Sequence, residues 1–109
     1  MATGTPATKL LKSAGIEFIE HEYSHDPNST SFGLEAAEKL GVDPNRVFKT
    51  LVANVDENFA VAIVPVNQQV SLKSLSRSLG AKRATMADPT QAARLTGYVV
   101  GGISPLGQK

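Results

Sequence analysis

The sequence predicts a single α/β or α+β domain built on a mixed sheet. Its 109 residues suffice for one core that buries roughly two thirds of the surface of the unfolded chain. Helical and strand patterns alternate along the chain, but a two-stranded hairpin interrupts the alternation. With 41% hydrophobic and 19% charged residues, the composition is that of a globular domain.

The N-terminal part is expected to hold two helices with a strand between them. A short helix from about Pro6 to Ala14 has proline at its first position and Gly15 at its end. The segment Ile16 to Tyr23 is rich in β-branched and aromatic residues, which favours a strand. A second helix is expected between Ser31 as the cap and Gly41 as the stop.

The centre of the chain predicts a β-hairpin. Two apolar runs, Val47 to Val55 and Phe59 to Val66, are joined by Asp56-Glu57-Asn58. Both runs are apolar at odd and even positions, so both strands are expected to be central and covered on both faces. Pro65 predicts that the second strand ends, bulges or lacks a neighbour near that point.

The C-terminal part predicts two more helices and two short strands. Ser71 is expected to cap a helix that ends at Gly80, with Leu72, Leu75 and Leu79 facing inward. Asp88-Pro89 predicts the start of another helix, which Gly97 would end. Short strands are expected at Ala84 to Met86 and at Tyr98 to Val100.

The formal net charge of +1 conceals two halves of opposite charge. Residues 1–66 carry five Lys or Arg against nine Asp or Glu, whereas residues 67–109 carry six against one. Such a basic half can contact phosphates, and it can equally be a solvated helix face. Its cations are Lys73, Arg77, Lys82, Arg83, Arg94 and Lys109.

Composition and N-terminal pattern argue against several classes of protein. The chain has no cysteine, so it can form neither a disulfide framework nor a thiolate nucleophile. Met1 to Pro6 lacks the pattern of a secretory signal, and the apolar run from Phe59 to Val66 is too short to span a bilayer. We therefore expect a cytoplasmic protein with no membrane partner.

His21-Glu22-Tyr23-Ser24-His25 matches the His-Glu-x-x-His pattern of zinc proteases. That chemistry needs a helix, which brings the two histidines together on successive turns. Here the match follows a strand pattern, in which residues four apart are separated by roughly 13 Å. We expect no metal site.

Two further features leave alternatives open. Lys49 shares a predicted strand face with apolar residues, so its ammonium either reaches out at the strand end or points into a cleft. The terminal segment Gly101 to Lys109 holds three glycines and a proline. It is either a surface turn or a loop that approaches a ligand closely.

The whole chain resembles the YbaK-type aminoacyl-tRNA deacylases. These include the free-standing bacterial enzyme that removes cysteine from mischarged tRNA for proline, and they are related to the editing domain inserted in many bacterial prolyl-tRNA synthetases. The segments that carry the resemblance are Thr3 to Ala7, Tyr23 to Asp26, Phe32 to Ala37, Val47 to Leu51, Ala62 to Val66, Met86 to Pro89 and Thr96 to Pro105.

The resemblance implies a mixed, mostly antiparallel curved sheet flanked by helices, with a cleft for the 3′-terminal adenosine and its ester-linked amino acid. It implies that Lys49 is the principal functional lysine and that the loop holding Gly101 and Gly102 lies opposite it. Because ester cleavage needs donors for the developing negative charge, we expect this loop to supply N–H groups to the ester. The substrate contacts it implies are Tyr23, Phe32, Thr50, Ser104 and Pro105. From the charge distribution we add Arg77, Lys82 and Arg83 as residues that bind tRNA. No cofactor is expected.

The activity implied is trans-editing of Cys-tRNA(Pro), in which the thiol of the substrate attacks the ester carbonyl. Thr50 favours the cysteine-editing branch over the alanine-editing one. The alternatives are editing of Ala-tRNA(Pro) and a non-catalytic module that binds tRNA or prolyl-tRNA synthetase. The resembling proteins continue beyond Gln108-Lys109, so we expect residues 1–109 to form one editing domain that lacks its C-terminal part. The sequence does not fix the edited amino acid, the synthetase partner or the oligomeric state.

Overall fold

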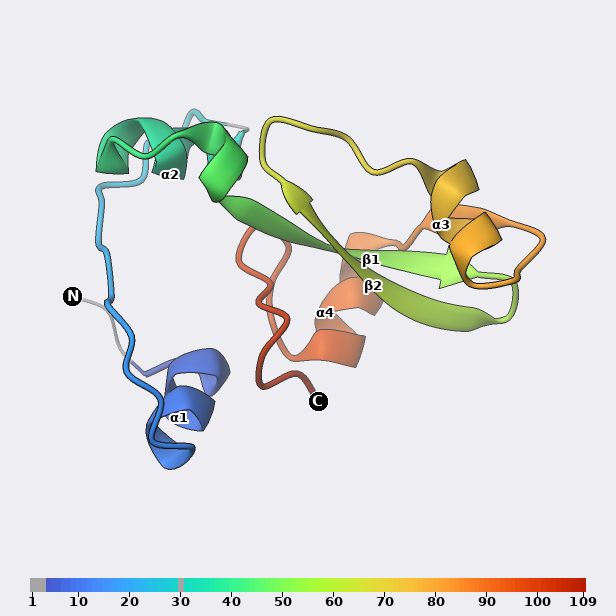
Figure 1. Ribbon diagram of the computed structural model, residues 1–109, viewed down its shortest axis with the longest axis horizontal. Helices are drawn as coiled ribbons and strands as arrows, with labels where there is room; N and C mark the ends of the chain where they lie inside the picture. The colour runs from blue at the N-terminus through green and yellow to red at the C-terminus, as the bar shows by residue number, and fades with distance from the viewer. Residues whose placement is uncertain (1–3, 30) are drawn as a thin grey trace.

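The computed structural model describes residues 4–29 and 31–109, and it arranges four α-helices around a three-stranded sheet (Figure 1). Residues 1–3, the first half of the Met1 to Pro6 segment that lacks a secretory-signal pattern, lie outside the described residues. In order the elements are α1 (Pro6–Ser13), α2 (Phe32–Leu40), the 3-10 turn η1 (Pro44–Arg46), β1 (Phe48–Val55), β2 (Asn58–Pro65), α3 (Leu72–Ser78), β3 (Ala84–Met86) and α4 (Pro89–Thr96).

The sheet has the strand order β2-β1-β3, and both pairings are antiparallel. The predicted hairpin is confirmed, with a register that runs from Phe48 opposite Pro65 to Val55 opposite Asn58. Because Asn58 already pairs, the turn contains only Asp56 and Glu57, one residue fewer than predicted. Within the described residues the sheet is therefore wholly antiparallel rather than mixed.

Two predicted strands do not form. Residues 16–23 form neither helix nor strand, and Ile19 is 80% exposed. Tyr98 to Val100 turns instead, since Gly97 is left-handed and the Gly102 amide donates to the Val99 carbonyl over 3.0 Å. A segment with strand propensity forms a strand only where a neighbouring strand pairs with its backbone N–H and C=O groups. Neither segment has such a neighbour in the described structure.

The two hairpin strands differ in burial. The prediction of a central strand is right for β1, where Val52, Ala53 and Val55 are buried. It is wrong for β2, which lies at the sheet edge and leaves Val61 and Ile63 about half exposed at 42% and 52%. In β2, apolar residues on both faces of the strand therefore did not indicate that both faces are buried.

The helix boundaries agree with the capping signals. The Ser71 hydroxyl accepts from the Ser74 amide, the Asp88 carboxylate accepts from the Thr90 amide, and Gly41 is left-handed at φ 65°. One inward residue of α3 was predicted wrongly. Leu79 is 54% exposed, because α3 packs along β3 and ends at Ser78.

The core is thin and lies where β1 meets its neighbours. Its buried apolar residues are Ala37, Val52, Ala53, Val55, Val66, Ala92 and Tyr98. Helix α1 buries no residue, but its first turn contacts the terminal loop: a Cβ added to Gly107 would lie 2.6 Å from the Pro6 carbonyl oxygen. In the part of the chain described, no helix has the length and apolar character needed to cross a membrane.

Candidate functional site

A pocket of about 770 Å³ lies between α2, the first half of β1 and the terminal loop. Its volume falls in the range of pockets that hold small ligands. Five of the residues selected from the sequence line it, and they come from four separate stretches of the chain. They are Tyr23, Phe32, Lys49, Thr50 and Gly101.

Lys49 is the cationic group of this pocket. It is the second residue of β1, pairs with Val64 across the hairpin and is half-buried. Its ammonium makes no hydrogen bond or ion pair within the described residues. A half-buried cation that lines a pocket and has no partner among the described residues can bind an anionic ligand group.

The first half of β1 also presents free backbone groups to the pocket. Strand β3 pairs only with Ala53 to Val55, and the Ala87 amide adds a bond to the Val52 carbonyl. In an antiparallel strand, alternate residues direct both N–H and C=O to the same side. The N–H and C=O of Thr50 therefore point to the side where, among the described residues, no strand lies.

The terminal loop forms the opposite wall through Gly101. This residue has φ 96°, a backbone conformation that favours glycine, and a Cβ there would lie 3.0 Å from the Phe32 ring, so the ring would have to shift to admit one. Gly102 does not line the pocket, and its amide already donates to Val99. The Gly101 amide makes no hydrogen bond within the described structure.

Ser104 and Pro105 do not line the pocket. The Ser104 hydroxyl accepts from the Leu106 amide over 3.1 Å, and its carbonyl accepts from Gln108 Nε2 over 2.9 Å. The loop is fixed further by Tyr98, whose hydroxyl donates to the Leu106 carbonyl over 2.8 Å. These contacts hold the loop in place behind Gly101.

The aromatic wall is attached to a polar cluster that sequence reasoning did not find. His25 Nδ1 lies 2.5 Å from Glu35 Oε1, and the imidazole stacks on the Phe32 ring with 5.1 Å between centroids. The hydrogen bond from His25, with a second from the Asp26 amide, holds the pKa of Glu35 below its ordinary value. Neither the spacing nor the periodicity of the sequence indicates this pairing, which joins residues ten apart.

The zinc-protease pattern does not adopt the geometry that it requires. Residues 21–25 form no helix, and His25 is paired with Glu35. Among the described residues no three His, Asp or Glu side chains gather in a way that could hold a metal ion.

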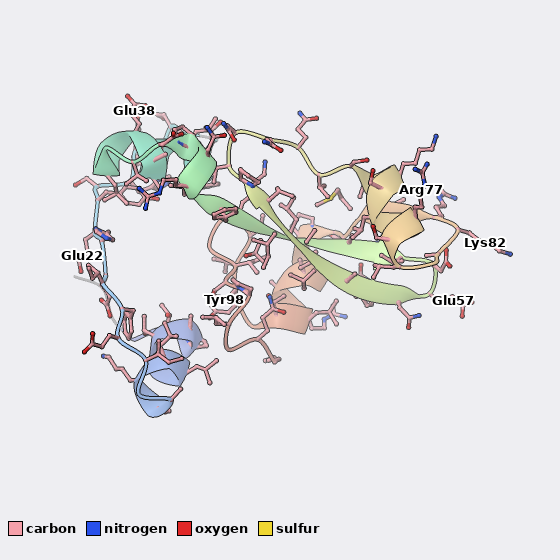
Figure 2. All side chains as sticks on the ribbon, in the orientation of Figure 1. Glu22, Glu38, Glu57, Arg77, Lys82 and Tyr98 are labelled. Carbon is pink, nitrogen blue, oxygen red and sulfur yellow. The ribbon has the colours of Figure 1, made fainter. Side chains whose placement is uncertain are left out.

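The predicted tRNA-binding residues lie outside the pocket. Arg77 and Lys82 project from the end of the molecule formed by α3 and the β1–β2 turn, whereas Tyr98 lies near its middle (Figure 2). The backbone of Lys82 and Arg83 is held there by Asp56, whose carboxylate accepts from their amides over 3.2 and 3.0 Å. The structure thus separates the basic residues from the pocket.

The comparisons with known proteins establish the family. Residues 26–109 match the family described as the aminoacyl-tRNA editing domain. The chain belongs to this family. An editing-domain relative from Enterococcus faecalis, provisionally named Cys-tRNA(Pro)/Cys-tRNA(Cys) deacylase EbsC, is 33% identical over 106 residues. The Escherichia coli protein named multifunctional Ser/Thr-tRNA deacylase ProXp-y is 38% identical over 102 residues.

The editing-domain chain is shorter than these relatives. The matched regions are 96% of the chain and 64% of EbsC, and 88% of the chain and 58% of ProXp-y. The proline–tRNA ligase of Desulforamulus reducens is 33% identical over 106 residues, which is 97% of the chain and 18% of the ligase. The chain thus matches less than two thirds of the length of each of these proteins.

Solved structures support the fold of the editing-domain chain. The crystal structure of hypothetical protein APE2540 superposes with a TM-score of 0.77 and 23% identity, over 96% of this chain and 68% of that one. A structure described as a trans-editing enzyme for prolyl-tRNA synthetase gives a TM-score of 0.73 at 23% identity, over 99% of this chain and 69% of that one. At this identity the likeness concerns the fold alone.

Proposed function

We propose that the chain hydrolyses the ester bond of a mischarged tRNA, with Cys-tRNA(Pro) as its substrate. The observation that carries the proposal is the convergence of three groups on one pocket: the unpaired Lys49 ammonium, the aromatic wall of Tyr23 and Phe32, and the unpaired Gly101 amide. Membership of the editing-domain family supports the reaction class.

In this proposal each group has a separate task. Lys49 binds a phosphate or hydroxyl of the terminal nucleotide, while Tyr23 and Phe32 pack against its base. The free backbone edge at Thr50 gives the base a donor and an acceptor. The Gly101 amide donates to the carbonyl oxygen as negative charge develops there, which is the step where a fixed donor lowers the barrier most.

The reaction itself uses the substrate. The cysteine thiol attacks its own ester carbonyl, the carbon–sulfur bond forms as the bond to the ribose oxygen breaks, and the thiol proton passes to that oxygen. Water then opens the resulting thioester to give free cysteine. The chain has no cysteine of its own, so the only thiol in the reaction belongs to the substrate.

The identity of the amino acid is the part of the proposal with competing candidates. The name of EbsC favours cysteine, and the name of ProXp-y favours serine or threonine, whose hydroxyl would replace the thiol. Alanine has neither group and would need water as the attacking species. A non-catalytic module that binds tRNA or prolyl-tRNA synthetase is the alternative of a different class.

The remaining residues have supporting roles in the proposal. Arg77, Lys82 and Arg83 contact the phosphates of the tRNA body, away from the pocket, while Gly102, Ser104 and Pro105 hold the loop that presents Gly101. Residues 1–109 act as one editing domain, with prolyl-tRNA synthetase as a partner that delivers the mischarged tRNA in the cytoplasm.

The role of Lys49 is tested by Lys49→Ala in a deacylation assay with Cys-tRNA(Pro). We expect the rate to fall by at least about 100-fold, the scale of losing one charged or hydrogen-bonding contact in the transition state. Lys9→Ala, which removes an exposed lysine of α1 that does not line the pocket, is the matched control and should leave the rate unchanged. A Lys49→Ala rate within threefold of the wild type would remove Lys49 from the mechanism.

A further inference from the structure

The starting point is Glu35, a carboxylate that is only 8% exposed and has both oxygens occupied. Oε1 accepts from His25 Nδ1 over 2.5 Å, and Oε2 accepts from the Asp26 amide over 2.8 Å. The Lys39 ammonium lies 3.6 Å from Oε2. Because an ionised carboxylate only accepts, His25 Nδ1 must carry the proton in this contact, so the orientation of the imidazole ring is fixed.

The fixed imidazole ring in turn contacts Phe32. The two rings stack with 5.1 Å between centroids and 28° between their planes. Phe32 is the first residue of α2, and Glu35 lies one turn further along the same helix. The helix and the segment that holds His25 are therefore joined twice, once by a charged hydrogen bond and once by the ring stack.

Phe32 transmits this arrangement to the pocket. Its ring lies so close to Gly101 that a Cβ there would be 3.0 to 3.3 Å from three ring atoms. Phe32 and Gly101 both line the pocket, whereas His25 and Glu35 do not. A continuous series of contacts thus runs from the buried carboxylate, through the imidazole and phenyl rings, to the backbone of Gly101.

We propose that His25 and Glu35 are positioning residues of the editing pocket, which hold the Phe32 ring against Gly101 and thereby set the place of the ester carbonyl. The expected effect on the deacylation rate rests on the proposed function. The placement of the Phe32 ring by His25 and Glu35 does not depend on it. The competing explanation is that the pair only anchors residues 24–26 to α2. The two explanations differ in what they require of His25: an anchor needs only its N–H donor, whereas positioning also needs its ring.

The substitution His25→Asn separates them, because asparagine keeps an N–H donor for Glu35 and removes the ring that stacks on Phe32. If the pair is only an anchor, asparagine keeps the hydrogen bond to Glu35 and the variant behaves like the wild type. If the imidazole ring positions Phe32, the variant remains folded but the Phe32 ring is no longer held against Gly101. His21→Asn, the same substitution at an exposed position of the same segment, is the matched control.

Two measurements are made on these variants. The first is the amide chemical shift of Gly101 in a ¹⁵N-labelled sample, since an aromatic ring in contact displaces this signal. We expect it to move in His25→Asn and to stay in place in His21→Asn. The second is steady-state deacylation, in which we expect kcat to fall about 10- to 100-fold in His25→Asn with KM within about twofold, as for a misplaced reacting group.

A double-mutant cycle with Phe32→Leu tests whether His25 and Phe32 act through one contact. If His25→Asn is poorly folded, Glu35→Gln is measured in its place, because it weakens the hydrogen bond to the imidazole and keeps both rings, and the Gly101 signal should again move. Phe32→Leu should give the same fall in kcat, and adding His25→Asn to it should have little further effect, because both act through one contact. Additive effects, or an unmoved Gly101 signal in His25→Asn, would overturn the positioning role. If the wild type cleaves none of the aminoacyl-tRNAs tested, the proposed function fails, and the Gly101 signal alone decides the positioning role.

Discussion

Lys49 and Gly101 differ in how far the sequence alone indicates their place at the pocket. Lys49 is visible in the sequence as one cation within an apolar strand pattern, and strand geometry places it at the start of β1 beside the pocket. The preference for glycine at 101 comes from φ 96° and from Phe32, which is 69 positions earlier in the chain. A contact of this kind has no local signal: the glycines and the proline left a ligand loop and a surface turn both open, and only the resemblance favoured the ligand loop.

The buried Glu35 gives a prediction about stability and pH. A carboxyl whose pKa is lower in the folded than in the unfolded chain adds stability that is complete above the unfolded pKa and is lost as pH falls through the folded one. The wild type should therefore lose stability as pH falls below about 4.5, the ordinary value for this group. In Glu35→Gln this acid-dependent part should disappear.

Chemical denaturation at a series of pH values between 7 and 3 measures the effect. Glu38→Gln, which neutralises an exposed carboxylate on the same helix, serves as the control and should keep the pH profile of the wild type (Figure 2). Parallel profiles for the wild type and Glu35→Gln would show that the His25–Glu35 contact does not persist in solution.

At the scale of elements, local signals defined the helices better than the strands. Caps and stops such as Ser71, Asp88 and Gly41 act on the neighbouring backbone, so short-range sequence determines them. A strand depends on a partner that local sequence does not specify. Residues 16–23 have the composition of a strand but pair with no neighbour in the part of the chain described. Strand β2 has the composition of a central strand but lies at the sheet edge.

The contact between α2 and the end of β2 gives a prediction at this scale. Gly33 packs so tightly on Val66 that an added Cβ would lie 2.3 Å from Val66 Cγ1, and both residues line the pocket. Gly33→Ala should destabilise the fold by about 1 to 3 kcal/mol through overpacking. It should also weaken substrate binding, because relief of the clash moves α2 and therefore Phe32.

Thermal unfolding and the KM for Cys-tRNA(Pro) measure the two effects. The control for stability is Glu38→Gly, at an exposed position of the same helix that does not line the pocket, which should cost about 1 kcal/mol through helix propensity. An unchanged melting temperature in Gly33→Ala would mean that α2 is not packed on Val66 in this way.

For the whole molecule, composition gave the single domain and the opposite charges of the two halves, while the resemblance gave the pocket. The structure places the pocket beside α2 and the terminal loop, whereas Arg77 on α3 and Lys82 just after it lie at the other end of the molecule (Figure 2). Periodicity could not reveal this separation, because it depends on how β1 crosses the molecule from one region to the other (Figure 1).

The separated basic end predicts a salt-dependent contribution to tRNA binding. Replacing Arg77 and Arg83 together by alanine should weaken binding and reduce the slope of log K against log salt by up to about 2, since each phosphate contact adds about one. Lys9→Ala with Lys12→Ala removes the same charge from α1 and should leave the slope unchanged. Equal slopes in the wild type and the Arg77 and Arg83 variant would assign these residues to a solvated face.

The central claim is that this editing domain cleaves the ester rather than merely binding the tRNA. The direct measurement is the release of labelled cysteine from Cys-tRNA(Pro) at neutral pH, with Ala-, Ser- and Thr-tRNA substrates in parallel and the spontaneous rate as the baseline. We predict multiple turnovers of Cys-tRNA(Pro) at a rate far above that baseline. A rate at or below the baseline for every substrate, with tight binding of the tRNA, would contradict the claim and indicate a module that protects the ester.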